Sequence, residues 1–275
     1  MKRRLFLKSA LGTGLAPFLL PKVNWGLAIL DLPKVLLIGD SISIGYTPHV
    51  KTALQNVAEV SRIAGNAQHT WNGLKKIDSW LGMTQWDLIH FNWGLWDLCY
   101  RNPKSTNQGK RDKINGTLTT SLEEYDENLR TLVARLKETQ ANLIWASTTP
   151  VPEGELGRIE GDDLIYNAAA KIIMEENNIE INDLHTFILP GFDTYQKAYG
   201  DVHYTSEGYE YIGLHVAEII KEALFSTVSV QKIVPKMSGI LWDQGDYYNL
   251  KGQVKPKFNR KAQRYLVPER KRPFQ

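Results

Sequence analysis

Residues 35–45 read VLLIGDSISIG: four aliphatic residues run directly into Gly-Asp-Ser, and a second glycine follows. An uninterrupted aliphatic run bounded by glycine is typical of a strand that is buried on both faces. The small residues around Ser41 suit a tight turn from this strand into a helix. Such a turn exposes a serine hydroxyl and directs backbone N–H groups toward developing negative charge. A helix cap made by Ser41 or Ser43 is an equally simple explanation of the motif taken alone.

Further short apolar runs alternate with amphipathic stretches along the chain. We expect strands at Val35–Ile38, Glu59–Ile63, Leu88–Asn92, Leu143–Ser147 and Ile179–Asp183. We expect helices at Ser121–Thr139, Asp162–Asn177 and Ser206–Phe225. This alternation predicts an α/β fold with a five-stranded parallel sheet covered on both faces. Sites in such folds lie at the carboxyl ends of the strands, which is where Ser41 falls.

Two segments that follow predicted strands are expected to be loops that overhang this edge. Residues 99–120 are rich in Asn, Lys, Thr and Gly, and residues 149–161 contain Pro and Gly. From residue 228 onward the strand and helix rhythm is lost, and we expect a basic C-terminal arm over residues 228–275. The folded body is then residues 29–227.

Charge is distributed unevenly along the chain, although the formal net charge is only +3. Residues 1–28 hold five basic and no acidic residues, residues 29–231 hold 17 basic against 27 acidic, and residues 232–275 hold 11 against 3. Basic ends meet anionic polymers, membranes or an acidic face of their own protein, and charge alone does not distinguish these partners. A hydrophobic content of 43% with eight Trp excludes a disordered chain and predicts a soluble globular protein.

The first 28 residues are expected to be a twin-arginine export signal. Residues 2–8 read KRRLFLK, an apolar stretch too short to span a bilayer follows from Ala10 to Leu20, and small residues at 26–28 suit cleavage. A single cysteine, Cys99, leaves no intramolecular disulfide, as suits a chain that folds before export. We therefore expect a periplasmic or secreted protein that uses the twin-arginine export machinery and keeps no membrane span after cleavage.

A base for Ser41 is expected near the other end of the chain. A serine hydroxyl is a weak nucleophile until a base removes its proton and a further group holds that base. Asp201 and His203 lie two residues apart just before the last predicted helix, in a loop that can return to the same sheet edge. A lone histidine is more often structural, but the nearby aspartate favours a catalytic pair.

Four blocks, in this order across residues 33–225, resemble the SGNH hydrolases, also called the GDSL family. They read IGDSI at 38–42, AGNA at 64–67, DLIHFNWGLWD at 87–97 and DVH at 201–203. The resemblance implies a flavodoxin-like three-layer sandwich and hydrolysis of acyl esters through an acyl-enzyme. It implies Ser41 as nucleophile, His203 as base and Asp201 as the acid that orients it. It also implies that the N–H groups of Ser41 and Gly65 hold the oxyanion.

The chain departs from the family pattern at two places. Trp96 stands where the third block usually carries its oxyanion asparagine, and either the Asn92 amide or the Trp96 indole N–H is a substitute donor. Alternatively, Asn92 ties neighbouring strands together. In the last block the aspartate usually lies three residues before the histidine, whereas Gly200 occupies that position here.

These features predict an exported serine esterase that removes acyl groups, chiefly O-acetyl groups, from carbohydrate. The alternatives are a lipid or small-ester hydrolase, or a non-catalytic carbohydrate-binding protein on a decayed hydrolase fold. Five tryptophans contact either a sugar or the core: Trp71, Trp80, Trp86, Trp93 and Trp96. No metal-ligand spacing links His69, His90, Asp97 and Cys99, and no phosphate-binding glycine loop occurs, so no metal, cofactor or nucleic-acid partner is expected.

Overall fold

Five parallel strands form the central sheet of the computed structural model, which describes residues 31–231 and the side chains of residues 31–226. The strands are β1 (Lys34–Ile38), β2 (Glu59–Arg62), β3 (Leu88–Phe91), β6 (Asn142–Ala146) and β7 (Glu180–Asn182). They lie in the order β2-β1-β3-β6-β7, and each neighbouring pair is parallel. This is the flavodoxin-like order, in which the chain reverses direction across the sheet between β1 and β3.

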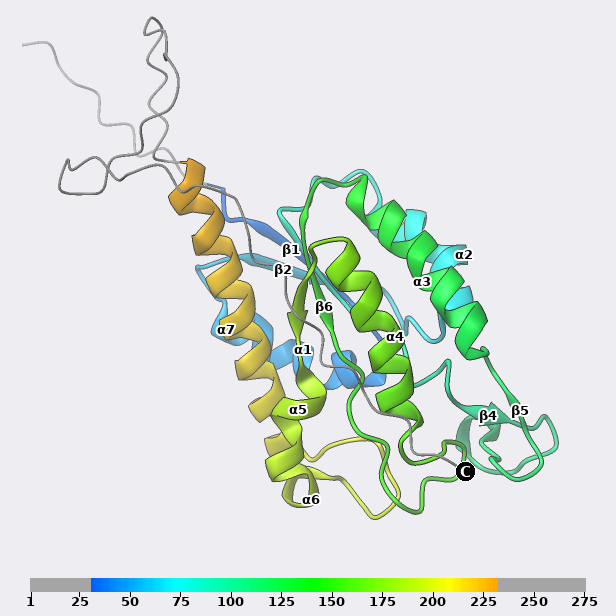
Figure 1. Cartoon of the computed structure of the whole chain (residues 1–275). Helices are drawn as coiled ribbons and strands as arrows, with labels where there is room; N and C mark the ends of the chain where they lie inside the picture. Colours follow the sequence, from blue (N-terminus) through cyan, green and yellow to red (C-terminus); the bar gives the residue numbers. More distant parts are fainter. Residues whose placement is uncertain (1–30, 232–275) are drawn as a thin grey trace, which may run out of the picture. The chain divides into compact units, whose positions relative to one another are not determined.

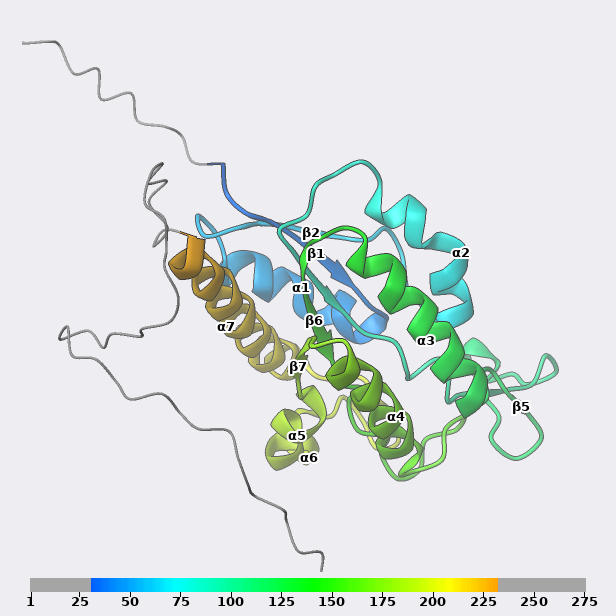
Figure 2. The same ribbon diagram turned by 45° about the horizontal axis from the view of Figure 1, so that its top comes forward.

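Helices cover both faces of the sheet (Figures 1 and 2). One face is covered by α1 (Ser41–Ala53) and α7 (Ser206–Gln231), and the other by α2 (Thr70–Leu81), α3 (Leu122–Lys137) and α4 (Asp162–Glu176). The predicted three-layer α/β fold is therefore confirmed. Among the described helices, none has the length and apolar character needed to cross a membrane.

Short elements fill the connections at the carboxyl edge of the sheet. The predicted loop 99–120 contains β4 (Tyr100–Arg101), the 3₁₀ helix η1 (Gln108–Lys110) and β5 (Thr117–Leu118), and β4 pairs antiparallel with β5. Before α7 come α5 (Leu184–Ile188), η2 (Leu189–Gly191) and α6 (Phe192–Tyr195). These segments are too short for a hydrophobic period to develop, so 99–120 was predicted as a loop from its composition, and no element was predicted for residues 184–195.

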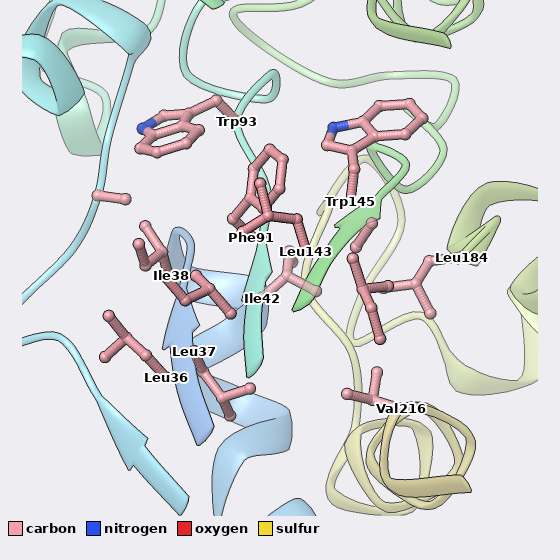
Figure 3. Close-up of a cluster of buried hydrophobic side chains, with 14 of the residues drawn as sticks. Leu36, Leu37, Ile38, Ile42, Phe91, Trp93, Leu143, Trp145, Leu184 and Val216 are labelled. Atoms are coloured by element: carbon pink, nitrogen blue, oxygen red, sulfur yellow. The ribbon is translucent and has the colours of Figure 1, made fainter. Parts of the chain in front are cut away.

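The aliphatic run of β1 is buried because layers of helix cover it from both sides. Val35, Leu37 and Ile38 are fully buried, and Figure 3 shows β1 side chains packed with Phe91 and Trp93 of the neighbouring segment. Each such side chain contributes roughly 1.5–3 kcal/mol when it leaves water. The central strands thus form a rigid base on which the loops at their carboxyl ends are held.

Local capping signals explain why α3 was predicted and why α2 was not. At the start of α3 the capping box is present, with Ser121 and Glu124 each bonded to the other's backbone N–H. By contrast, α2 is capped by His69, whose Nδ1 accepts from the N–H of Asn72 at 3.3 Å. Histidine is not a usual capping residue, so the sequence carries no clear start signal for α2.

The predicted signal segment, residues 1–28, lies outside the described residues, as does the predicted basic arm beyond residue 231. The last helix, α7, continues to Gln231 and so extends past residue 228, the predicted start of the arm.

Candidate active site

Ser41 is the first residue of α1 and follows β1 across the two-residue turn Gly39-Asp40. The helix is capped by Asp40, whose Oδ1 accepts from the N–H of Ile42 at 2.9 Å, and not by Ser41 or Ser43. Ser43 instead donates its hydroxyl to the carbonyl oxygen of Asp40 at 2.9 Å. The N–H of Ser41 has no acceptor among the described residues. An unpaired N–H at a helix start is favourable for a negatively charged group.

The structure brings the histidine of the last loop to this serine. His203 Nε2 lies 2.9 Å from Ser41 Oγ, and His203 Nδ1 lies 2.6 Å from Asp201 Oδ1. The two side chains are partly open to solvent, with exposed fractions of 35% for His203 and 29% for Asp201. Serine, imidazole and carboxylate are therefore hydrogen-bonded in series at the carboxyl edge of the sheet.

The unusual Asp-x-His spacing has a backbone cause. Gly200 has φ +72, and a Cβ at this position would lie 2.7 Å from the carbonyl oxygen of Gly154. The position three residues before His203 therefore accepts only glycine. Asp201, one residue later, uses one oxygen for both the ring and the backbone N–H of His203, the latter at 3.1 Å.

Electrostatics favour the ionised form of Asp201. Partial burial by itself raises the pKa of a carboxyl group, but hydrogen bonds from the ring and backbone N–H of His203 outweigh it. The pKa of Asp201 is consequently lower than usual. A carboxylate in this position holds the imidazole with Nδ1 protonated and Nε2 free to accept a proton.

Arg62, which the sequence did not single out, ties the second glycine loop to the nucleophile turn. Its guanidinium donates to the carbonyl oxygens of Gly65 at 2.6 Å and Gly39 at 2.9 Å. It also contacts the hydroxyl of Ser43 at 3.0 Å. A separate backbone bond joins the N–H of Ala67 to the carbonyl oxygen of Gly39 at 3.0 Å. Gly65, with φ +76, is thereby fixed beside the turn that carries Ser41.

A pocket of about 320 Å³ opens at the serine and the histidine. Its lining residues are Ser41, Asn66, Trp96, Arg101, Gln108, Gly109, Arg111, Arg158 and His203. Both predicted loops, 99–120 and 149–161, contribute side chains to this wall. A larger cavity of about 760 Å³ lies between α1 and α7, but it contains no residue of the serine–histidine–aspartate series, so volume does not locate the chemistry.

The two predicted substitute donors lie in different places. The amide of Asn92 donates to the carbonyl oxygen of Ala146 at 2.8 Å and contacts Thr148 Oγ1 at 3.4 Å. The amide nitrogen is thus directed to the end of β6 and the residues just beyond it, so Asn92 links neighbouring strands, as in the alternative interpretation. Trp96 does line the pocket, as does Asn66, which the sequence analysis did not name. Asn66 accepts from the N–H of Gln68 at 2.7 Å through Oδ1, and its amide nitrogen has no acceptor among the described residues.

The tryptophan cluster belongs mostly to the core. Trp93 is fully buried, while Trp80 and Trp86 pack against the core. Trp71 is 47% exposed on α2 and is absent from the pocket wall. Trp96 is the member of the five that lines the pocket, and the guanidinium of Arg101 lies 4.2 Å from its ring centroid.

The remaining histidine and aspartate candidates have structural contacts. Asp97 is buried and accepts from the N–H and hydroxyl of Thr70 at 2.8 and 2.7 Å, and burial raises its pKa to about 7. His90 is buried on β3 beside Asn182, and burial lowers its pKa to about 3. Within residues 31–226, no group of three or more His, Cys, Asp or Glu side chains is arranged to hold a metal ion.

Comparisons with known proteins place this geometry in a family. The model of the GDSL-like lipase/acylhydrolase family matches residues 37–211. No curated protein matches the chain.

Solved structures are similar at low sequence identity, which shows a shared fold. A lipase/acylhydrolase from Enterococcus faecalis is 20% identical with a TM-score of 0.57, and the match covers 70% of this chain and 97% of that one. For an acetylxylan esterase from Geobacillus stearothermophilus the values are 17%, 0.54, 70% and 94%. A GDSL-like lipase from Bacteroides thetaiotaomicron gives 16%, 0.53, 69% and 88%. With the family model covering more than half of its length, the chain belongs to the GDSL-like lipase/acylhydrolase family and is a serine hydrolase that acts on esters.

Proposed function

We propose that this protein removes small acyl groups, chiefly acetyl, from carbohydrate through an acyl-enzyme formed on Ser41. The observation that carries the proposal is the hydrogen-bonded series from Ser41 through His203 to Asp201 at the mouth of a pocket of about 320 Å³. This arrangement supports catalysis over a purely binding role on a decayed fold, because binding a sugar requires no serine bonded to an imidazole nitrogen.

The contacts suggest the course of the reaction. Ser41 Oγ attacks the ester carbonyl carbon while His203 Nε2 takes the hydroxyl proton, and Asp201 stabilises the imidazolium. The same proton then passes to the leaving alcohol, which departs from the acyl-enzyme. A water molecule, deprotonated by His203, attacks the acyl carbon and releases the acid and free Ser41.

Negative charge on the tetrahedral oxygen needs donors that are not already bonded. The N–H groups of Ser41 and Gly65 have no acceptor among the described residues. We assign the third donor to the pocket wall, where the Asn66 amide and the Trp96 indole are the two candidates. Asn92 is no longer proposed, because its amide protons are directed to Ala146 and Thr148.

The preference for acetyl esters of carbohydrate is supported by two observations. Acetylxylan esterases are among the proteins with a similar fold. Trp96 offers an aromatic ring in the pocket, and such rings stack on sugars, although Arg101 covers one of its faces. Lipid hydrolysis remains the rival reading, and acyl-chain preference separates the two.

Serine replacement tests the proposal directly. Ser41→Ala should lower turnover of 4-nitrophenyl acetate and of acetylated xylo-oligosaccharides on the order of a million-fold, while the circular dichroism spectrum stays unchanged. Ser79→Ala, on the exposed side of α2, is the matched control and should retain full activity. Near-normal turnover by a folded Ser41→Ala protein would exclude Ser41 as the nucleophile. Faster turnover of octanoyl than of acetyl esters by the wild type would favour the lipid reading.

We also propose export by the twin-arginine route, on the basis of residues 2–8. The double variant Arg3→Lys/Arg4→Lys should remain in the cytoplasm as the precursor. Lys22→Arg, a conservative exchange outside the pair, should be exported normally. Undiminished export of the double variant would contradict the assignment.

A further inference from the structure

One wall of the active-site pocket is formed by three arginines. Arg101, Arg111 and Arg158 line the same cavity as Ser41 and His203. No aspartate or glutamate is among the residues that line it. The residues around a ligand bound next to Ser41 therefore include three arginines and no aspartate or glutamate.

A single buried carboxylate lies behind two of these arginines. Glu155 is fully buried, and its Oε1 accepts from Arg111 at 2.6 Å and from Arg158 at 3.0 Å. Its Oε2 is occupied by the N–H groups of Gly157, at 2.6 Å, and of Arg158. Glu155 is thus the one carboxylate that pairs directly with Arg111 and Arg158 among the described residues, and the two guanidinium groups share it.

Arg101 has no carboxylate partner in the described part of the chain. One of its terminal nitrogens donates to the carbonyl oxygen of Gly109, and its plane covers the ring of Trp96. Its Nε is buried without any hydrogen-bond partner. A buried donor without an acceptor is costly. The second terminal nitrogen of Arg101 has no acceptor among the described residues and is not fully buried, so it is the atom that a ligand oxygen can contact.

The three cations also repel one another. Burial is the main reason that the pKa of Arg101 is lowered; the positive charges of Arg158 and Arg111 lower it further, while Cys99 and Glu155 oppose them. This repulsion does not help to hold the loops that carry the three arginines in place. The arrangement becomes favourable when an anion occupies the space that the guanidinium groups face.

From these contacts we propose that the ester substrate carries an anionic oxygen-acid group, a carboxylate, sulfate or phosphate, which Arg101, Arg111 and Arg158 bind beside Ser41. The inference rests on the proposed ester hydrolysis and specifies its substrate class. On a carbohydrate it points to an acylated sugar that is a uronic acid or carries a sulfate or phosphate ester. If the acyl group is acetyl, the anion lies on the alcohol part of the substrate.

Four aryl acetates of similar size test the charge requirement. The anionic esters are 4-acetoxybenzoate, 4-acetoxyphenyl sulfate and 4-acetoxyphenyl phosphate, and 4-acetoxybenzamide is the neutral match. For each ester, kcat/KM of the wild type is divided by that of Arg101→Gln, which cancels the intrinsic reactivity of the ester. We expect a ratio of roughly 10–100 for at least one anionic ester, mainly through KM, and a ratio within about threefold for the amide.

Two controls separate charge recognition from loop support. Arg130→Gln removes an arginine that pairs with Asp126 and Glu176 on the outer surface of α3, and it should leave all four rates unchanged. Arg101→Lys keeps the charge and should recover part of the anionic rate. In the wild type, added NaCl should weaken the preference for anionic esters, because salt screens the attraction.

The outcomes distinguish this inference from the proposed function. Which anionic ester shows the largest ratio identifies the group as carboxylate, sulfate or phosphate. Equal losses on anionic and neutral esters in Arg101→Gln, together with a salt-independent wild type, would overturn the anion site while ester hydrolysis stands. Absence of turnover on all four esters by the wild type would overturn both.

Discussion

Two groups of one serine, one histidine and one aspartate lie at the carboxyl edge of the same sheet in the described part of the chain. The Ser41 group consists of Ser41, His203 and Asp201, and the Ser147 group consists of Ser147, His185 and Asp183. Ser41 and His203 line a cavity of about 320 Å³, and all three members of the Ser147 group line one of about 360 Å³. Residue types and cavity size therefore do not distinguish the reactive serine from the other one.

The order of the hydrogen bonds separates the two groups. Ser147 donates its hydroxyl to the carboxylate of Asp183 at 2.8 Å and accepts from the backbone N–H of His185 at 2.9 Å. The ring of His185 instead contacts Asp163 at 2.7 Å and is only 10% exposed. A carboxylate is a far weaker base than an imidazole, so the hydroxyl of Ser147 is fixed in place and not activated. The comparison shows that a serine is activated by the atom that accepts its proton.

The largest effect that tests this contrast is the loss of an orienting carboxylate. Asp201→Asn should lower turnover of an acetyl ester by up to about ten-thousand-fold, because the amide favours the wrong tautomer of His203. Asp163→Asn makes the same chemical change at His185 and should leave turnover within about threefold. Steady-state kinetics on both folded variants provide the measurement. A loss smaller than tenfold in Asp201→Asn would mean that another group orients His203.

The sequence predicted the parts of the site that depend on local order. A buried strand must end at the sheet edge, and so the position of Ser41 follows from the run that precedes it. Asp201 and His203 are close in sequence, and the following helix fixes where their loop returns. The positions of these residues at the sheet edge needed only periodicity and chain order, whereas their roles came from the resemblance to the SGNH hydrolases.

The parts that were not predicted depend on long side chains that reach across the fold. Arg62 reaches from β2 to carbonyl groups of two separate loops, and Arg158 reaches the carbonyl oxygen of Leu95 at 2.5 Å. No spacing rule predicts such contacts. The bond from the Asn92 amide to Ala146 was likewise not predicted, because strand alternation gives the face on which a side chain lies and does not give its hydrogen-bond partner there.

The Ser41 group also lies beside hydrogen-bond donors that have no acceptor among the described residues, and this second difference predicts a loss of kcat of intermediate size. If the Asn66 amide stabilises the oxyanion, Asn66→Ala should lower kcat roughly a hundred- to a thousand-fold with little change in KM. If the Trp96 indole does so, Trp96→Phe should show that loss, since phenylalanine keeps an aromatic ring and removes the N–H.

Asn92→Ala is the control for this pair, and it should be mild on activity because its amide is bonded to Ala146. Rates on 4-nitrophenyl acetate distinguish the candidates. Should neither Asn66→Ala nor Trp96→Phe lose even tenfold, the two backbone N–H groups alone hold the oxyanion, and the third-donor assignment fails.

The smallest effect on activity is expected at Ser147, and this prediction tests directly whether Ser147 takes part in the reaction. Ser147→Ala should leave ester turnover within about threefold and lower the free energy of unfolding by about 1–3 kcal/mol, because the N–H of His185 loses its acceptor.

Burial alone would raise the pKa of Asp183, but hydrogen bonds from Thr186 and Ser147 outweigh it, and the pKa is lower than usual. A carboxyl group with a lowered pKa in the folded state stabilises the protein above its unfolded pKa, about 3.9, and this contribution is lost as the pH falls through the folded value. The stability difference between wild type and Ser147→Ala should therefore be full at pH 7 and shrink toward pH 3, as urea unfolding at the two pH values would show. A folded Ser147→Ala protein that loses activity to the same degree as Ser41→Ala would mean that hydrogen-bond order does not separate the two groups.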